Sequence, residues 1–487
     1  MTRAKQTKLN ILAALLYQTV TAICGLILPR FILLHFGSEV NGLMQSVSQM
    51  LGYTVLLEGG IGGVVLAALY GPLARGDQKT VSGIFYGTKR FFGRISAVFA
   101  VFALVLSMLA GKILPTELGA GYVALLVLLL AANSYFNYYF GLPHQLLMKA
   151  DQRLYVVQIT QMVTTVLNLL ACILAMELGA GIHLVKLITV AVFAANPLVY
   201  RWYVKKHYAL VKPADKEKQM LPQKRDAVVH HLSFFIHRNT DVVILSLFSG
   251  LGSASVYSVY NAVILTMEHL LASVSSGVAG ALGNIIAKDE KKTLTSSFDL
   301  YEAVNTALAA AFTVVAAAHL LPFVSIYTRG VEDVRYVQPL FAGLMLAAGF
   351  AYCLRMPYGT VVSTAGHYRQ TRFGAVGEVV LNLAVSLTLV KPMGLAGVAA
   401  GTLVGMIFRT VYLAWYLSKK LLQRPLWKFF VSLAGNFLLG AGLFLLFPER
   451  SAGSLLQLIW DAAKMSAVVF PVMLAANLLP VQLKRKA

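Results

Sequence analysis

The chain has 487 residues, of which 58% are apolar and only 13% are charged, and its mean hydropathy is +0.71. These values exclude an ordinary soluble globular protein and place the chain in a lipid bilayer. The formal net charge of +21 does not indicate nucleic-acid binding, because the basic residues form neither a cluster on a soluble face nor a known binding motif.

Apolar segments long enough to cross a bilayer recur along the whole chain. The sequence therefore predicts an all-α polytopic membrane protein. Its expected fourteen transmembrane helices lie at residues 9–36, 41–70, 85–112, 118–146, 154–177, 183–204, 228–250, 254–287, 297–325, 336–363, 371–390, 394–417, 427–447 and 455–480.

The connecting segments alternate between rich and poor in Lys and Arg. If the N-terminus is placed in the cytoplasm, 30 of the 41 basic residues fall in inner segments and five in outer segments. Cytoplasmic loops of membrane proteins are enriched in Lys and Arg. The alternation supports the helix count and predicts a cell-membrane protein with both termini in the cytoplasm.

The longest polar stretch, residues 201–226, separates six predicted helices from eight. We expect an N-terminal six-helix lobe at residues 1–208, a cytoplasmic linker at 209–227, a second six-helix lobe at 228–420 and two additional helices at 421–487. Shifting the sequence by 215 positions gives seven identities, among them Gly37 with Gly252 and Tyr86 with Tyr301. This predicts a parallel repeat, with substrate between the two lobes.

Six basic residues lie inside predicted helices, where each costs at least about 2.5 kcal/mol if it faces lipid at mid-depth. They are Arg30, Lys186, Arg238, Arg355, Arg409 and Lys464. The two lysines and Arg409 lie near helix ends, and we expect their long side chains to reach the headgroups. The other three arginines are too deep for that.

Two interpretations remain open for Arg30, Arg238 and Arg355. They form structural ion pairs with acids at similar depth, or they form an anion site, since guanidinium stays charged and binds phosphate oxygens bidentately. The candidate counter-ions are Glu58, Asp241, Glu268 and Glu378, and Asp241 stands three residues after Arg238 on one helix face.

The fourth predicted helix carries Asn133 and Asn137, one turn apart, and Tyr138 among other aromatic residues. Such a cluster is either a headgroup belt or a sugar-binding wall. No metal site is expected, because the nearest candidates, three histidines between residues 230 and 237, have no acidic partner at a suitable spacing. No cofactor is expected either, and the chain has no P-loop.

Several stretches resemble Wzx-like polysaccharide flippases. They are Leu28-Pro29-Arg30-Phe31 through Gly37 to Asn41-Gly42-Leu43, Leu147 to Gln152, Tyr203 to Tyr208, Arg238 to Leu245, and Val256 to Asn261. The resemblance implies the multidrug/oligosaccharidyl-lipid/polysaccharide exporter fold, with two six-helix lobes in a V and two extra helices. It also implies a sugar on undecaprenyl phosphate or pyrophosphate as cargo, and phosphate binding by Arg30, Arg238 and Arg355.

The expected partners are therefore the lipid-linked sugar, membrane lipids, and glycan polymerases or glycosyltransferases of the same pathway. A cation-coupled multidrug exporter of the same fold is the first alternative, but it would place acids in its cavity, and the first helix offers Arg30 and no acid. A lipid-linked sugar polymerase or ligase would need a sizeable outer loop, and the expected outer loops are short. A membrane scaffold that transports nothing leaves the deep arginines unexplained.

Overall fold

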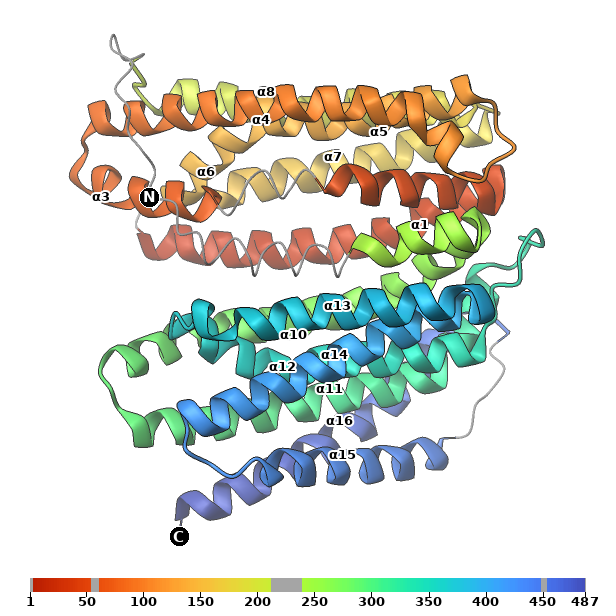
Figure 1. The fold of residues 1–487 in the computed structure, drawn as a ribbon. Helices are drawn as coiled ribbons and strands as arrows, with labels where there is room; N and C mark the ends of the chain where they lie inside the picture. Colours follow the sequence, from red (N-terminus) through yellow and green to blue (C-terminus); the bar gives the residue numbers. More distant parts are fainter. Residues whose placement is uncertain (1–2, 54–60, 212–238, 448–452, 487) are drawn as a thin grey trace. The chain divides into compact units, whose positions relative to one another are not determined.

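A computed structural model describes residues 3–53, 61–211, 239–447 and 453–486, and every regular element in these ranges is helical (Figure 1). The elements are α1 (Arg3–Gly52), α3 (Ile61–Arg75), α4 (Gln78–Ile113), α5 (Ala120–Phe136), the π-helix η1 (Asn137–Gly141), α6 (Leu142–Ala150), α7 (Leu154–Glu177), α8 (Ile182–His207), α10 (Leu251–Ala287), α11 (Lys291–Tyr327), α12 (Pro339–Thr364), α13 (Tyr368–Met393), α14 (Leu395–Lys420), α15 (Trp427–Leu446) and α16 (Leu455–Lys486).

Twelve helices in the described ranges are long and apolar enough to cross a membrane, and Ile61–Arg75 and Asn239–Phe248 are shorter apolar helices. This confirms the all-α, multi-pass membrane class. The predicted spans 41–70 and 228–250 lie partly outside the described residues.

The long helix α1 contains the first predicted span and the beginning of the second. Gly37 interrupts it with a φ of 76°, a left-handed conformation that glycine adopts at little cost. The interruption falls in the predicted loop between residues 36 and 41, so α1 consists of two helices joined at a kink.

The chain divides into two compact units, Met1–His231 and Leu232–Ala487, called here the N-terminal and C-terminal units. In the N-terminal unit, α1 packs against α7, α4 against α5, and α7 against α8. Its apolar core includes Phe92, Leu147 and Tyr200. These packed helices enclose the polar side chains described below.

The turns of the two units repeat in order. Residues with positive φ recur 213 to 215 positions apart, as Gly37 and Gly250, Gly76 and Asp289, Gln152 and Gly366, and Gly179 and Gly394. The helices that follow the second pair, α4 and α11, also begin 213 residues apart. The predicted repeat is therefore present, but Gly37 corresponds to Gly250 and not to Gly252. Backbone turns mark equivalent positions more reliably than scattered identities on helix surfaces, where many residues are tolerated.

In the C-terminal unit, α14 lies very close to α13 because three glycines, each four residues after the last, face it. A Cβ atom added at Gly397 would lie 2.2 Å from the carbonyl oxygen of Leu389, and one at Gly401 would lie 2.1 Å from Ser386 Oγ. At Gly405 the added atom would lie 3.0 Å from the Glu378 carbonyl oxygen. Small residues at this spacing let membrane helices approach backbone to backbone.

Within the C-terminal unit, the last two helices, α15 and α16, both pack against α11 (Figure 1). Met465, Val469 and Met473 of α16 join the alanine-rich face of α11 in one apolar cluster. Between α15 and α16, the amides of Asn436 and Asn477 donate to each other's oxygens at 3.0 and 2.8 Å. Reciprocal amide bonds of this kind hold helices together in lipid, where water does not compete for them.

The segment between α14 and α15 is attached to α11 by Arg424. Its guanidinium donates to both carboxylate oxygens of Glu302 at 2.6 Å and to Asp299 Oδ1 at 2.9 Å. It also lies 4.8 Å from the ring centroid of Phe298. Burial alone would lower the pKa of Arg424, but the hydrogen bonds and charge of Glu302 outweigh it and raise the pKa above its usual value.

Replacing Arg424 should therefore loosen this attachment. We expect Arg424→Gln to lower the free energy of unfolding by about 2 kcal/mol, because Glu302 and Asp299 lose a charged, bidentate donor. Thermal unfolding of the detergent-solubilised protein measures this. The matched control is Arg369→Gln, since Arg369 is exposed, and its effect should stay within about 0.5 kcal/mol. Equal effects of the two changes would contradict the assignment.

Candidate functional site

A polar cavity of about 510 Å³ lies inside the N-terminal unit, between α1, α5, η1, α7 and α8. Its volume is within the range of about 300–1,000 Å³ that is usual for small-molecule sites. The polar residues that line it are Tyr17, Thr21, Asn133, Ser134, Asn137, Gln161, Thr165, Asn168, Lys186, Thr189, Asn196 and Tyr200. None of the described lining residues is acidic.

Two residues of the predicted sugar wall, Asn133 and Asn137, lie in this lining. Tyr138, the third, is buried and lines a smaller adjacent cavity of about 270 Å³, which shares Asn133 and Lys186 with the first. Two further amides of the lining, Gln161 and Asn168 of α7, were not predicted from the sequence. Their spacing of seven residues, or two helical turns on one face, was the signal that would have found them.

The π-helix η1 contributes Asn137 to the cavity lining. It begins at Asn137, whose Oδ1 accepts a hydrogen bond from Gln145 Nε2 at 2.9 Å. A Cβ atom at Gly141 would lie 2.6 Å from that same oxygen, so glycine makes room for the bond. Single π-helical turns inside α-helices are frequent at functional sites. Here the turn lies at the wall of the cavity.

Lys186 was predicted to reach the headgroups, but its side chain is buried. It exposes only 8% of its surface and lines both cavities. Arg409 is also buried, and it donates to the carbonyl oxygen of Thr371 at 3.0 Å. The distance of these two residues from a helix end therefore did not predict their burial, because it does not show which side of the helix faces neighbouring helices. Lys464 is more than half exposed and pairs with Asp461 at 3.3 Å.

The predicted phosphate ligand Arg355 lies in the C-terminal unit, where it forms an ion pair with Glu378. The other carboxylate oxygen of Glu378 lies 3.7 Å from Arg409 Nε. The Arg355 guanidinium also lies 4.5 Å from the ring centroid of Tyr352. Two arginines thus share one buried carboxylate, which leaves a formal charge of +1 on these three side chains. The structural pairing that the sequence left open is present for Arg355.

The other candidates are less closely grouped. Arg30 lies half-buried in α1, directly after Pro29 of the cavity lining. Glu268 is buried in α10. Arg238 and Glu58 lie outside the described residues. The predicted pairing of Arg238 with Asp241 therefore also lies outside them.

Asp241 is buried and accepts hydrogen bonds from two neighbouring helices of the C-terminal unit. Thr402 Oγ1 donates to its Oδ2 at 2.6 Å, and the Tyr257 hydroxyl donates to the same oxygen at 3.2 Å. Asn382 Nδ2 in turn lies 3.1 Å from Thr402 Oγ1. These bonds link α10, α13 and α14 to the helical segment Asn239–Phe248 through one carboxylate.

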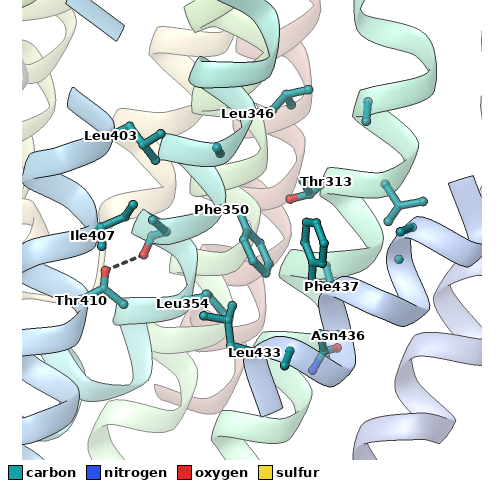
Figure 2. A pocket seen from close by; sticks show the side chains of 18 of the residues that line it. Thr313, Leu346, Phe350, Leu354, Leu403, Ile407, Thr410, Leu433, Asn436 and Phe437 are labelled. Atoms are coloured by element: carbon teal, nitrogen blue, oxygen red, sulfur yellow. Dashed lines mark hydrogen bonds between the residues drawn. The ribbon is translucent and has the colours of Figure 1, made fainter. Parts of the chain in front are cut away.

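The C-terminal unit also contains a large apolar cavity of about 800 Å³ between α11, α12, α14 and α15 (Figure 2). Phe350 of α12 and Phe437 of α15 project into it, and Leu346, Leu403 and Ile407 form part of the wall (Figure 2). Because Thr410 Oγ1 donates to the Ala351 carbonyl oxygen at 2.8 Å, the hydroxyl adds little polarity to the lining. This cavity was not predicted from the sequence.

Solved structures of two kinds of transporter resemble the chain. A multidrug resistance MATE family transporter of the MOP superfamily, in an inward-facing conformation, matches with a TM-score of 0.70 and 13% identity over 82% of this chain and 94% of its own. The lipid II flippase MurJ, in an inward closed conformation, matches with a TM-score of 0.68 and 15% identity over 96% and 98%.

An outward-facing MATE family transporter matches with a TM-score of 0.59 and 10% identity over 85% of this chain and 95% of its own. No protein-family profile matches the sequence, and no curated protein is significantly similar to it. At these identities the likeness establishes the fold. The chain is a multi-pass membrane protein with the fold that MATE transporters and the lipid II flippase share.

Proposed function

We propose that the chain is a transporter that flips a lipid-linked oligosaccharide, carried on undecaprenyl phosphate or pyrophosphate, from the cytoplasmic to the outer leaflet by alternating access. The observation that carries the proposal is the apolar cavity of about 800 Å³, one wall of which is α15. Such a cavity suits part of a prenyl chain, whereas the polar head of the cargo needs polar surroundings to cross about 30 Å of hydrocarbon.

The length of the structural matches agrees with a lipid cargo. The lipid II flippase covers 96% of this chain, whereas the MATE transporters described above cover 82% and 85%. The fact that relatives of this fold have been solved in inward-facing and outward-facing conformations supports alternating access. Cell-surface polysaccharide synthesis is the corresponding process, with glycosyltransferases and polymerases as pathway partners.

A cation-coupled multidrug exporter is the competing function, since the MATE transporters share the fold. A cationic drug calls for acidic residues where it binds. The described lining of the N-terminal cavity contains Lys186 and five amide side chains and no acid. This composition favours neutral or anionic cargo.

Reconstitution tests the proposal. Liposomes containing the protein and fluorescent undecaprenyl-pyrophosphate-linked sugar should show flipping, measured by quenching of the label in the outer leaflet. We expect Arg30→Ala and Arg238→Ala to slow flipping at least about tenfold through loss of charge-assisted phosphate contacts. Ala347→Phe, which fills the apolar cavity, should slow it similarly, while Leu456→Phe on an exposed position of α16 serves as the matched control.

A membrane potential provides a second measurement. Moving a dianion out of a compartment that is negative inside releases about 4.6 kcal/mol at roughly 100 mV, so an imposed inside-negative potential should accelerate flipping without ATP. Export of a cationic dye that is driven by an inward cation gradient, with no flipping of the labelled lipid, would establish the drug exporter instead.

A further inference from the structure

Lys186 is a buried cation that none of the described residues neutralises. It stands in the first turns of α8 and is more than nine-tenths buried. Within the described chain its ammonium makes no hydrogen bond and no ion pair, and no aspartate or glutamate of the described N-terminal unit is buried. The side chain lines the 510 Å³ cavity and the smaller one beside it.

This arrangement is energetically unfavourable without a ligand. A buried charge costs several kcal/mol unless an opposite charge or several hydrogen bonds compensate it. An anion in the cavity would compensate the buried charge.

The rest of the lining supplies the donors that an oxyanion and a sugar need. The side-chain nitrogens of Asn133, Asn168 and Asn196 make no hydrogen bond within the described chain and line the cavity. The oxygens of the last two are already engaged, with Cys172 Sγ at 3.3 Å and Thr164 Oγ1 at 2.9 Å. Asn168 and Asn196 are therefore oriented to donate rather than to accept.

We propose that the polar cavity of the N-terminal unit binds the carboxylate or phosphate group of a sugar-sized ligand, with Lys186 as the counter-ion and Asn133, Asn168 and Asn196 as hydrogen-bond donors. If the proposed function holds, the group belongs to the cargo, either as an acidic sugar of the glycan or as the phosphate of the lipid carrier. The proposal itself concerns binding and does not need transport to be tested.

Calorimetry on the full chain in lipid nanodiscs tests it with three probes: glucuronate, glucose and inorganic phosphate. We expect glucuronate to bind at least about tenfold more tightly than glucose, because only glucuronate offers a carboxylate to Lys186. Lys186→Met should abolish the preference and Lys186→Arg should keep it. The matched control, Lys464→Met, removes an exposed lysine from another membrane helix and should leave the preference unchanged.

The melting temperature without ligand separates this role from a structural one. Because Lys186→Met removes a buried charge that has no partner among the described residues, the ligand-free variant should melt no lower than the native protein. Glucuronate should stabilise the native protein and not the variant. A large drop in the ligand-free melting temperature would instead reveal a structural role and overturn the proposal.

The probes also identify the source of the anion. Binding of glucuronate that depends on Lys186 indicates an acidic sugar, and binding of phosphate alone that depends on Lys186 indicates the lipid carrier. Equal binding of glucuronate and glucose with no binding of phosphate would overturn the proposal. If Lys186-dependent binding is found and flipping is not, only the proposed function fails; flipping without anion binding would leave the function and remove this site.

Discussion

Glu378→Gln should destabilise the protein by about 3–5 kcal/mol, the loss expected when one partner of a buried ion pair is removed. Glu378 is the carboxylate that Arg355 and Arg409 share, and the side chains of all three expose 11% or less of their surface. The neutral amide would remove the carboxylate that the two guanidinium groups share. Unfolding of the purified protein by heat or denaturant measures the loss.

The matched change is Arg355→Met, which leaves Glu378 in contact with Arg409. We expect it to cost less than about 2 kcal/mol. If Arg355 also holds the cargo's phosphate, Arg355→Met should slow flipping at least about tenfold in protein that remains folded. A Glu378→Gln variant as stable as the native protein would show that the pair contributes nothing to the fold.

Gly401→Ala should destabilise the protein by about 3 kcal/mol, although it adds a single methyl group. The added carbon would lie 2.1 Å from Ser386 Oγ, 2.7 Å from the Ser386 backbone nitrogen and 2.8 Å from the Asn382 carbonyl oxygen. Two of these atoms are backbone, so α13 and α14 must move apart, and overpacking of this kind costs about 1–3 kcal/mol or more. The shift also separates Asn382 from Thr402, whose bond leads to Asp241.

Gly359→Ala is the control for the previous change. Gly359 lies in α12, and an added Cβ there would meet nothing within 4 Å. Alanine is the better helix former, so this variant should gain about 0.5–1 kcal/mol. The two glycine changes should thus have opposite signs in one unfolding assay. Destabilisation of the same size in both would mean that the close contact between α13 and α14 is not what the Gly401 variant disturbs.

The polar residues that could be located from the sequence are those that stand within apolar helices. Asn133 and Asn137 were found because amides are rare in an apolar helix, and both line the polar cavity. Arg355 was found because a charged residue is also rare in an apolar helix. Two interpretations of Arg355 remained, because its depth is read from its own helix, whereas its pairing depends on a second helix. Its partner Glu378 comes from α13, which follows α12.

Lys186 and Arg409 show where this reasoning stops. Both lie near a helix end, and a long side chain on a lipid-facing side would reach the headgroups. The structure turns both toward other helices, so one lines a polar cavity and the other contacts α13. The rotation of a helix about its axis is set by packing with its neighbours, and a single sequence records it weakly when a helix is apolar on all sides.

By itself, the sequence determined the all-α membrane class, the positions of most membrane helices and the existence of a repeat. Each of these follows from a local requirement: in lipid, a segment must be apolar and must satisfy its own backbone hydrogen bonds. Only the tertiary structure decided the repeat register, the approach of α14 to α13, the sharing of Glu378 by two arginines and the burial of Lys186. These depend on which side chains of different helices meet within a few ångströms, and hydropathy along one chain does not specify that.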